Sequence, residues 1–352
     1  MMKALVLDEY GLKYKVNAPT PKMGAEDVLV RVEAVGICGT DIAIIKHTLE
    51  APLPIIPGHE IAGIIEKVGA AVPSDIGALV GKRVTMEINT RICGTCFYCK
   101  SGMPTQCINR KALGIDINGG MAEFVTIHHS LIHLVPPKLT PEEATLIEPL
   151  AAALQTFEMM PIQDGDRSVV LIGDGKLALL ILGVLVAFKK GFGESPFRGE
   201  IMMVGHHESK LEIARMLGAD MTLNSSVLPE RKLLKKVFAF TGEQGADVTI
   251  EATGNPRALN QAILITRARG NIGLKSTHGV SVPFNLTLAV VKELTLYTSR
   301  CGPFEKAIRL IQEIQEPFLK HLISGVYPLS KGKEAFKDLE YRRDALKYVL
   351  KP

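Results

Sequence analysis

The sequence lacks an uninterrupted apolar run long enough to span a membrane. Its strongly apolar stretch at residues 168–188 is broken by Asp174 and Lys176, whereas a spanning helix needs about 18 or more consecutive apolar residues. The first residues, MMKALVLDEY, also lack the apolar region and cleavage site of a secretion signal and read better as a β-strand. We therefore expect a cytoplasmic protein with no membrane partner.

An excess of charge of one sign is also missing. The chain carries 41 basic and 37 acidic residues, a formal net charge of +4. No basic run or basic–aromatic interleaving stands out, so nucleic-acid and membrane-surface binding are not expected. With 352 residues, 47% of them apolar, the chain can build a sizeable core and about two domains. No internal repeat or low-complexity linker divides it.

Short β-type runs separated by glycine and proline dominate the chain up to about Ala151. Examples are VLVRVEAVGIC, IAGIIEKVGAAV and KRVTMEI, and they predict a β-rich, barrel-like domain. Near its end, Thr140-Pro141-Glu142-Glu143 has the pattern of a capping box with proline at the first helical position. It predicts a helix that leads out of this domain.

From Ser168 onward, predicted strands alternate with predicted helices. SVVLIG, IMMVG, ADVTIEATG and NIGLKST read as strands, and LALLILGVLVAF, ESKLEIARMLGA and QAILITRA as helices, the second closed by Gly218. This alternation predicts an α/β domain with a parallel, doubly wound sheet. The tail from about Gly302 is expected to return to the first domain. The predicted domains are 1–151 with 302–352, and 152–301.

Four of the six cysteines are clustered. Cys93, Cys96, Cys99 and Cys107 have the spacing C-x2-C-x2-C-x7-C, which lets four thiolates surround one tetrahedral Zn²⁺. Because sulfur would fill every coordination position, the zinc would be structural. Two disulfides or free buried thiols are the alternatives, and they fit a chain without a secretion signal less well. A zinc-ribbon nucleic-acid module would have two widely separated cysteine pairs.

A second potential ligand set is dispersed along the first domain. It comprises Cys38 in GICGTD, His59 and Glu60 in PGHE, and Glu148 in IEPL. One sulfur, one imidazole and two carboxylates suit a zinc that keeps one exchangeable position. Each residue alone has an ordinary structural explanation, such as a packed thiol or a hydrogen-bonded histidine. Spacing alone leaves the metal and the structural interpretations evenly balanced.

A glycine-rich turn follows the first predicted strand of the second domain. Gly173-Asp174-Gly175-Lys176-Leu177-Ala178 matches the dinucleotide fingerprint G-x-G-x-x-G/A. The glycines allow a tight turn and close approach of a pyrophosphate, which the N-terminus of the following helix would bind. A plain turn between a strand and a helix is the alternative. Thr253, after a later strand, completes the expected cofactor-binding residues.

The end of the second predicted strand bears on the type of cofactor. NAD-binding proteins usually carry an acidic residue there for the ribose hydroxyls, and this sequence has Gly205. Without a carboxylate a 2′-phosphate would not be repelled, and His206, His207 and Lys210 could contact it. We therefore expect NADP in preference to NAD. The histidines could instead be ordinary surface residues, with Glu208 as the acid.

Together these motifs resemble the zinc-containing medium-chain alcohol dehydrogenases over essentially the whole chain. The ordered set GICGTD, PGHE, the four-cysteine loop, IEPL and GDGKLA is highly specific to that family. Because IEPL carries Glu148, the chain resembles the sorbitol and threonine dehydrogenase branch, and VGHHESKLEIA, LKST and SRCGPF resemble an uncharacterised subgroup. The resemblance implies a discontinuous GroES-like catalytic domain and a Rossmann domain, with the active site between them. It also implies a homodimer or homotetramer.

The resemblance assigns roles to individual residues. Cys38 and His59 become ligands of a catalytic zinc, while Glu60 and Glu148 would bind it directly, through water or in exchange. Thr40 matches the hydroxyl that contacts the substrate oxygen, and Asp41 lies behind the ligands. Lys347 matches a basic residue near the cofactor pyrophosphate. Many relatives carry a histidine where this chain has Ala43, so the route of the proton is open; His47 is a candidate substitute.

These assignments imply a zinc-dependent oxidoreductase. It would transfer hydride between NAD(P) and a secondary alcohol, polyol or sugar, with Zn²⁺ stabilising the alkoxide and Thr40 receiving its proton. An L-threonine 3-dehydrogenase-like activity is the closest alternative. A zinc-free quinone reductase shares the architecture but not the ligand set. A non-catalytic NAD(P)-binding zinc protein is the alternative from another functional class.

Overall fold

The computed structural model describes residues 1–193, 196–277, 280–314 and 318–352. They form two compact units. The first unit combines Met1–Glu148 with Ile323–Pro352, and the second is Pro149–Leu322. The first unit is therefore discontinuous in sequence. Its first boundary lies close to the expected one, whereas the second lies at Leu322 and not at residue 301, because the helix and 3-10 turn that follow residue 302 pack in the second unit.

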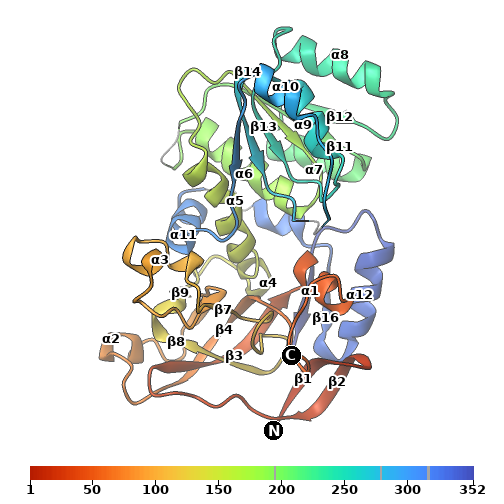
Figure 1. The fold of residues 1–352 in the computed structure, drawn as a ribbon. Helices are drawn as coiled ribbons and strands as arrows, with labels where there is room; N and C mark the ends of the chain where they lie inside the picture. The colour runs from red at the N-terminus through yellow and green to blue at the C-terminus, as the bar shows by residue number, and fades with distance from the viewer. Residues whose placement is uncertain (194–195, 278–279, 315–317) are drawn as a thin grey trace. The chain divides into compact units, whose positions relative to one another are not determined.

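Mostly antiparallel strands build the first unit. They are β1 Met2–Asp8, β2 Gly11–Ala18, β3 Asp27–Gly36, β4 Glu60–Val68, β5 Arg83–Met86, β6 Asn89–Thr90, β7 Lys111–Ala112, β8 Phe124–His128, β9 Ile132–Leu134, β16 Gly325–Pro328 and β17 Tyr348–Lys351. The seven-stranded sheet has the order β16-β17-β3-β4-β5-β9, with β8 also paired to β3, while β1-β2 and β6-β7 form separate pairs (Figure 1). The prediction of a β-rich domain is confirmed.

Strand β3 is central to this unit, and its sequence shows why. Val28 and Val30 are fully buried and Val32 nearly so, whereas Arg31 between them is exposed, as expected where alternate side chains point to opposite faces of a sheet. Near its end, β3 pairs with β4 on one side and β17 on the other, so Gly36 lies opposite both Glu60 and Val349. This pairing brings the end of the chain beside the PGHE segment.

Short helices connect these strands. They are α1 Gly39–Ile45, α2 Ser74–Gly77, α3 Phe97–Lys100, α4 Pro141–Ala144 and α12 Gly332–Tyr341, with 3-10 turns η1 Pro104–Gln106, η2 His129–Leu131 and η4 Leu329–Lys331. The predicted capping box is present, because the Glu143 N–H donates to Thr140 Oγ1 over 3.2 Å and the Thr140 N–H to Glu143 Oε2 over 2.9 Å.

The helix that this box opens is short. It ends at Ala144, and α5, Ile147–Met159, begins after a break. At the break, the Thr145 hydroxyl donates to the Glu142 carbonyl over 2.7 Å. Such bonds from threonine to the preceding turn compete with the helical backbone pattern.

A parallel sheet forms the middle of the second unit. Its strands are β10 Ser168–Ile172, β11 Glu200–Gly205, β12 Met221–Asn224, β13 Ala246–Glu251, β14 Thr266–Leu274 and β15 Thr295–Thr298. Their order is β12-β11-β10-β13-β14-β15, and every pairing is parallel. The direction of winding therefore reverses beside β10, and ligands of such sheets bind at the carboxyl ends of the strands at this point.

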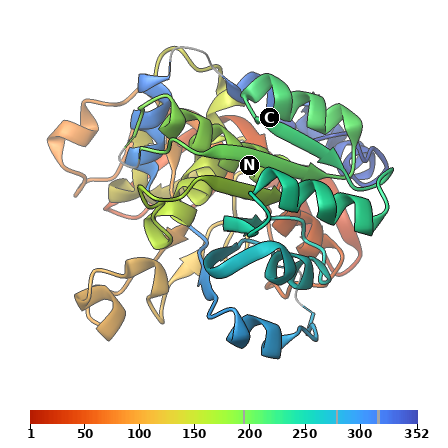
Figure 2. The same ribbon diagram turned by 90° about the horizontal axis from the view of Figure 1, so that it is seen from above.

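Helices cover this sheet (Figure 2). They are α6 Lys176–Lys189, α7 Glu208–Leu217, α8 Glu230–Phe240, α9 Ala258–Ile265, α10 Leu286–Val291 and α11 Phe304–Glu313, with the 3-10 turn η3 Phe318–Leu322. Helix α6 packs against α7 and η3, while α9 packs against α8 and α10. The predicted doubly wound α/β domain is confirmed.

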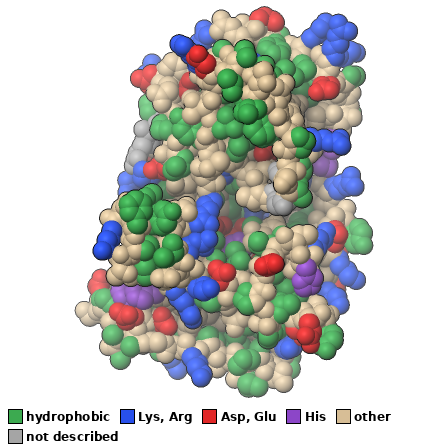
Figure 3. Space-filling view, viewed as in Figure 1, with side chains coloured by type: hydrophobic (Ala, Val, Ile, Leu, Met, Phe, Trp, Pro, Cys, Tyr) green, Lys and Arg blue, Asp and Glu red, His purple; other side chains and the backbone are tan. Residues whose placement is uncertain are grey.

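The distribution of charged and apolar side chains in the structure agrees with the composition of the sequence. On the face shown in Figure 3, basic and acidic side chains are interspersed, in keeping with the balanced charge. Within the described residues no helix combines the length and the apolar character that crossing a bilayer requires.

Asp247 joins the amino ends of two strands in the second unit. Its Oδ2 accepts the N–H groups of Arg167 and Ser168 over 2.9 and 3.0 Å, and its Oδ1 accepts Arg267 Nε–H over 2.6 Å. The side chain is 7% exposed. Burial alone would raise the pKa of Asp247, but Arg267 and these N–H groups lower it below its ordinary value.

Asp247→Asn is expected to lower the free energy of unfolding by about 1–3 kcal/mol at pH 7, because the buried charged acceptor is lost. Since the folded-state pKa is depressed, this stabilisation is complete above the ordinary aspartate pKa and disappears as pH falls through the folded-state pKa. Urea unfolding at pH 7 and pH 3 measures both effects. Asp164→Asn, at an exposed aspartate, is the control; an equal loss in both variants contradicts the prediction.

Candidate functional site

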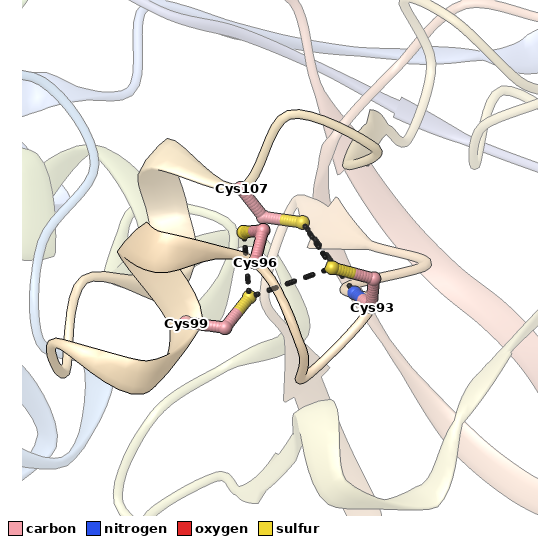
Figure 4. A group of neighbouring side chains, drawn as sticks. All are labelled: Cys93, Cys96, Cys99 and Cys107. Carbon is pink, nitrogen blue, oxygen red and sulfur yellow. Dashed lines mark hydrogen bonds between the residues drawn. The ribbon is translucent and has the colours of Figure 1, made fainter.

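The four clustered cysteines converge on one point in the first unit (Figure 4). Cys96 precedes α3, Cys99 lies within it, and Cys107 follows η1. The Sγ–Sγ distances are 3.5 Å for Cys96–Cys99 and for Cys93–Cys107, and 3.9 Å for Cys93–Cys99. A disulfide requires about 2.05 Å, whereas zinc–sulfur bonds of 2.3 Å in a tetrahedron separate the sulfurs by about 3.8 Å. The donor set fits a tetrahedral zinc.

Backbone N–H groups favour the thiolate form of part of this cluster, whereas burial and the neighbouring thiols raise the pKa of Cys99. The N–H groups of Thr95 and Cys96 lower the pKa of Cys93 to about 5. The N–H groups of Cys93 and Asn109 both point to Cys107 Sγ over 3.4 Å. Metal binding requires the deprotonated form of cysteine, so this loop is organised for a cation.

Cys96→Ser is expected to reduce the bound zinc by about one ion per chain and to lower the thermal unfolding midpoint, because a tetrahedral site loses one ligand. Plasma emission spectrometry and differential scanning calorimetry measure the two effects. Cys301→Ser is the matched control, since Cys301 is a free cysteine outside both ligand groups. Unchanged zinc content in Cys96→Ser would show that the loop does not hold a metal.

A second potential ligand group lies elsewhere in the first unit. One ligand atom each from Cys38, His59 and Glu60 lie within 4.8 Å of one another. His59 and Glu60 are buried, and His59 Nδ1 has no hydrogen-bond partner among the described residues. A buried imidazole within reach of a thiol and a carboxylate fits a divalent metal, and the unpartnered Nδ1 lies on the side of Asp41. Burial disfavours the charged imidazole, but Asp41 and Cys38 raise the pKa of His59 to about 9.

Asp41 organises this group from behind. It is fully buried in α1, where its Oδ2 accepts the Cys38 N–H over 2.8 Å and its Oδ1 accepts the Gly58 N–H over 3.1 Å. Its Oδ1 also lies 3.7 Å from His59 Nδ1. Asp41 therefore fixes the two turns that carry Cys38 and His59.

The other residues that the sequence assigned to this site lie at different distances from the three-residue group. Thr40 Oγ1 lies 3.8 Å from Cys38 Sγ. Glu148 is 8% exposed and interacts electrostatically with His59, although it lies outside the tight three-residue group. His47 follows the end of α1 with a φ of 55°, and it lines a separate cleft with Glu50.

Lys347 is buried within the first unit. Its side chain is fully buried in the first unit, where Nζ pairs with Glu60 and donates to the Ile37 carbonyl over 3.1 Å. A Cβ at Gly36 would collide with both charged groups, so this glycine makes room for the pair. Burial lowers the pKa of Lys347 to about 8. Lys347 is therefore enclosed beside Glu60 within the first unit, and its role near the cofactor pyrophosphate stays a prediction.

The glycine-rich turn lies in the second unit, at the carboxyl end of β10. Gly173 has a φ of +122°, and a Cβ there would lie 2.7 Å from the Ala252 carbonyl oxygen, so only glycine fits. Gly175 caps α6, and no atom lies within 4 Å of its potential Cβ. The predicted strand, turn and helix are confirmed, with an open approach to the first turn of α6.

A cavity of about 750 Å³ extends from this turn within the second unit. The predicted residues in its lining are Gly173, Asp174, Gly175, Gly205, His206, His207, Lys210 and Thr253. Lys176 and Leu177 belong to the first turn of α6 beside it. The structure therefore brings the predicted cofactor residues of the second unit together at the point where the strand order reverses.

Asp174 changes the basis of the cofactor prediction. Its Oδ2 accepts the N–H groups of His206 and His207 over 2.6 and 2.7 Å, and it lies 3.2 Å from His207 Nδ1. A carboxylate thus lies at the end of β11, where the sequence shows Gly205. The premise of the NADP prediction, the absence of an acidic group there, does not hold.

Sequence reasoning missed several residues in and near this cavity, three of which lie at or just after the end of β13. Asn255 and Arg257 line it, and Glu251 lies at the carboxyl end of β13, where its Oε1 accepts the Thr253 N–H and hydroxyl over 2.8 and 2.5 Å. The available signal was their position directly after the predicted strand ADVTIEATG, since the ends of parallel strands share one edge of a sheet.

Comparisons with known proteins agree with this architecture. The model of the alcohol dehydrogenase GroES-like domain matches residues 24–137, and that of the zinc-binding dehydrogenase domain matches residues 197–316. The chain is 35% identical over 342 residues to L-threonine 3-dehydrogenase of Pyrococcus furiosus, covering 94% of this chain and 92% of that protein. The chain belongs to the zinc-containing medium-chain alcohol dehydrogenase family.

Two further relatives extend the comparison. Sorbitol dehydrogenase of Bacillus subtilis is 30% identical over 369 residues, covering 100% of this chain and 97% of that protein. A structure from Sinorhizobium meliloti 1021, bound to NADP, matches with a TM-score of 0.86 and 26% identity, covering 100% of this chain and 99% of that chain. Family membership confirms the predicted resemblance, the two-part fold and the class of oxidoreductases.

Proposed function

We propose that this oxidoreductase transfers hydride between a nicotinamide dinucleotide and a secondary alcohol, polyol or sugar, with zinc in its catalytic site. The observation that carries this proposal is the convergence of Cys38, His59 and Glu60 in a chain that also forms the glycine-rich dinucleotide turn. The names of the Bacillus and Pyrococcus relatives support a small hydroxylated substrate.

The two ligand groups suit different roles. Four thiolates would fill every position of a tetrahedral zinc, which supports a structural role for the cysteine loop. Cys38 and His59, completed by Glu60 or Glu148, leave a position for the substrate. Zinc bound there supplies Lewis-acid polarisation of the substrate oxygen. Glu60 lies in the converging group and also pairs with Lys347, so Glu60 and Glu148 are both candidate carboxylate ligands in this proposal.

The protein residues around the metal hold its ligands and handle the proton. Asp41 keeps the Cys38 and His59 turns in place through its bonds to the Cys38 and Gly58 N–H groups. In this proposal Thr40 Oγ1, beside Cys38 Sγ, accepts the proton of the substrate hydroxyl and in the same step passes its own hydroxyl proton on towards solvent. With alanine at position 43, this threonine carries the first step of proton release in our proposal.

The cavity of the second unit is the proposed dinucleotide site. The first-turn N–H groups of α6 and the open space over Gly175 suit the pyrophosphate. The bound cofactor supplies the hydride chemistry, and the protein supplies its position. The NADP preference relied on His206, His207 and Lys210 without a competing carboxylate, and Asp174 among them argues for the unphosphorylated cofactor. A cytoplasmic location remains a prediction.

L-Threonine is the second substrate to test, because the Pyrococcus relative bears that activity in its name. Cofactor reduction is measured across simple secondary alcohols, polyols, sugars and L-threonine, with NAD⁺ and with NADP⁺. A clear preference for L-threonine would assign the amino alcohol, and a preference for sorbitol-like compounds the polyol. No turnover of any of them by zinc-loaded protein would contradict the proposed substrate class.

Cys38→Ser is expected to lower kcat at least about 100-fold, because even groups that only orient metal ligands contribute 10–100-fold to activity or affinity. Binding of reduced cofactor should be unchanged, since its cavity lies in the second unit. Steady-state assays and fluorescence titration measure the two properties, and Cys301→Ser is the control. Full activity in Cys38→Ser would remove Cys38 from the catalytic site.

The proposed oligomer is supported by an exposed edge of the second unit. Strand β15 pairs only with β14 among the described strands, and α10 before it exposes Leu286, Val290 and Val291 by 60–73%. An unpaired edge beside an apolar surface suits a second copy related by twofold symmetry. We propose that two chains associate through this edge, with a tetramer as the larger alternative.

Val290→Glu is expected to convert the oligomer to smaller species, because charges would face each other across a symmetric interface. Light scattering after size-exclusion chromatography measures the mass. Val227→Glu is the matched control, as Val227 is 72% exposed and lies outside β15 and α10. A monomeric wild type, or an equal response of both variants, would contradict association through this edge.

A further inference from the structure

The Asp174 carboxylate and Gly205 share one place at the carboxyl edge of the sheet. A Cβ on Gly205 would lie 2.7 Å from Asp174 Cβ, 3.0 Å from Asp174 Oδ2 and 2.8 Å from Leu211 Cδ2. A side chain at position 205 and the observed Asp174 conformation therefore exclude each other. The acidic group that usually ends the second strand is supplied here from the turn after the first strand.

The two oxygens of Asp174 have different surroundings. Oδ2 accepts the N–H groups of His206 and His207 and lies near His207 Nδ1. No hydrogen bond joins Oδ1 to another described residue, and the side chain retains 12% exposure in the lining of the cavity. One oxygen thus fixes the carboxylate, while the other can accept hydroxyl groups of a ligand.

This arrangement is unfavourable for a phosphate at the end of β11. Backbone N–H groups are common donors to phosphate, but those of His206 and His207 already donate to Asp174. These bonds and Lys210 also keep the pKa of Asp174 below its ordinary value despite burial. A 2′-phosphate would therefore meet a like charge and occupied donors.

We propose that Asp174 binds the adenosine ribose hydroxyls and selects NAD over NADP. The inference rests on the proposed dinucleotide site. Vicinal hydroxyls donate hydrogen bonds that a carboxylate accepts well, and such charge-assisted bonds are about twice as strong as neutral ones. Asp174 is thus a specificity-determining residue that occupies the x position of the glycine-rich turn.

Basic side chains elsewhere in the cavity do not remove this selectivity. Lys210 and Arg257 line the same cavity, and Lys210 is close enough to Asp174 to lower its pKa. The Lys210 ammonium group can bind ribose hydroxyls together with the Asp174 carboxylate. The negative charge of Asp174 balances the positive charge of Lys210. Discrimination against the 2′-phosphate follows from the position of the carboxylate against Gly205 and not from the total charge of the cavity.

The test is titration of the zinc-loaded enzyme with NADH and with NADPH, followed by cofactor fluorescence. The wild type should bind NADH more tightly. Asp174→Asn keeps an oxygen for the His206 and His207 N–H groups but removes the charge, so the ratio of the NADPH to the NADH dissociation constant should fall by about 10- to 100-fold. In the same variant, inhibition by 2′,5′-ADP should become stronger relative to inhibition by 5′-AMP.

A charge swap and a matched control complete the experiment. The double variant Asp174→Gly with Gly205→Asp moves the carboxylate to the strand end, and NADH preference should return. Asp220→Asn is the control, because Asp220 also accepts a backbone N–H, that of Ile201 over 2.8 Å, at the start of β11. Its cofactor ratio should stay at the wild-type value.

The outcomes separate this inference from the proposed function. Tighter NADPH binding by the wild type, or an equal weakening of both cofactors in Asp174→Asn, would overturn the assignment of Asp174 and leave the dehydrogenase proposal intact. A double variant that binds NADH but keeps the lowered NADPH-to-NADH ratio of dissociation constants of Asp174→Asn would also overturn it. Failure of the folded wild type to bind either dinucleotide would overturn the proposed function and this inference together.

Discussion

Buried aspartates that accept backbone N–H groups hold the critical turns of both units. A buried carboxylate is costly unless donors surround it, so each of these residues ties together the segments that supply its donors. Asp41 joins the Cys38 turn to the Gly58 turn. Asp247 joins the start of β10 to β13, and Asp174 joins the glycine-rich turn to the end of β11. The proposed metal and dinucleotide sites each depend on one such residue.

The same constraint explains the unusual burial of Lys347. Glu60 begins β4 inside the first unit, and its charge requires a partner there. Pairing of β17 with β3 delivers Lys347 across Gly36, the position at which a side chain would block the contact. A residue close to the end of the chain thereby takes part in the environment of the proposed catalytic metal, although it belongs to none of the local motifs that mark that site.

Motifs and residue spacing predicted the structure well where a feature is built from residues close together in the sequence. The four-cysteine loop, the capping box at Thr140 and the turn at Gly173 are local, so their chemistry can be read directly. Features that depend on distant segments were harder to predict. Strand β12 has four residues of which only Leu223 is buried, and it shows no clear alternation. The short α4 ends where the Thr145 hydroxyl competes for a carbonyl. The second boundary of the first unit moved to Leu322 because of packing, which leaves no compositional mark.

The sequence by itself determined the class of fold, the four-cysteine cluster and the family, because these depend on residue types at short, fixed spacings or in a fixed order. Only the tertiary structure decided which charges meet. It placed Lys347 beside Glu60 and filled the space at Gly205 with the Asp174 carboxylate. Neither contact can be inferred from one sequence position at a time. The physical reason is that electrostatic environment depends on distances through space, and the sheet brings together side chains that are up to hundreds of residues apart.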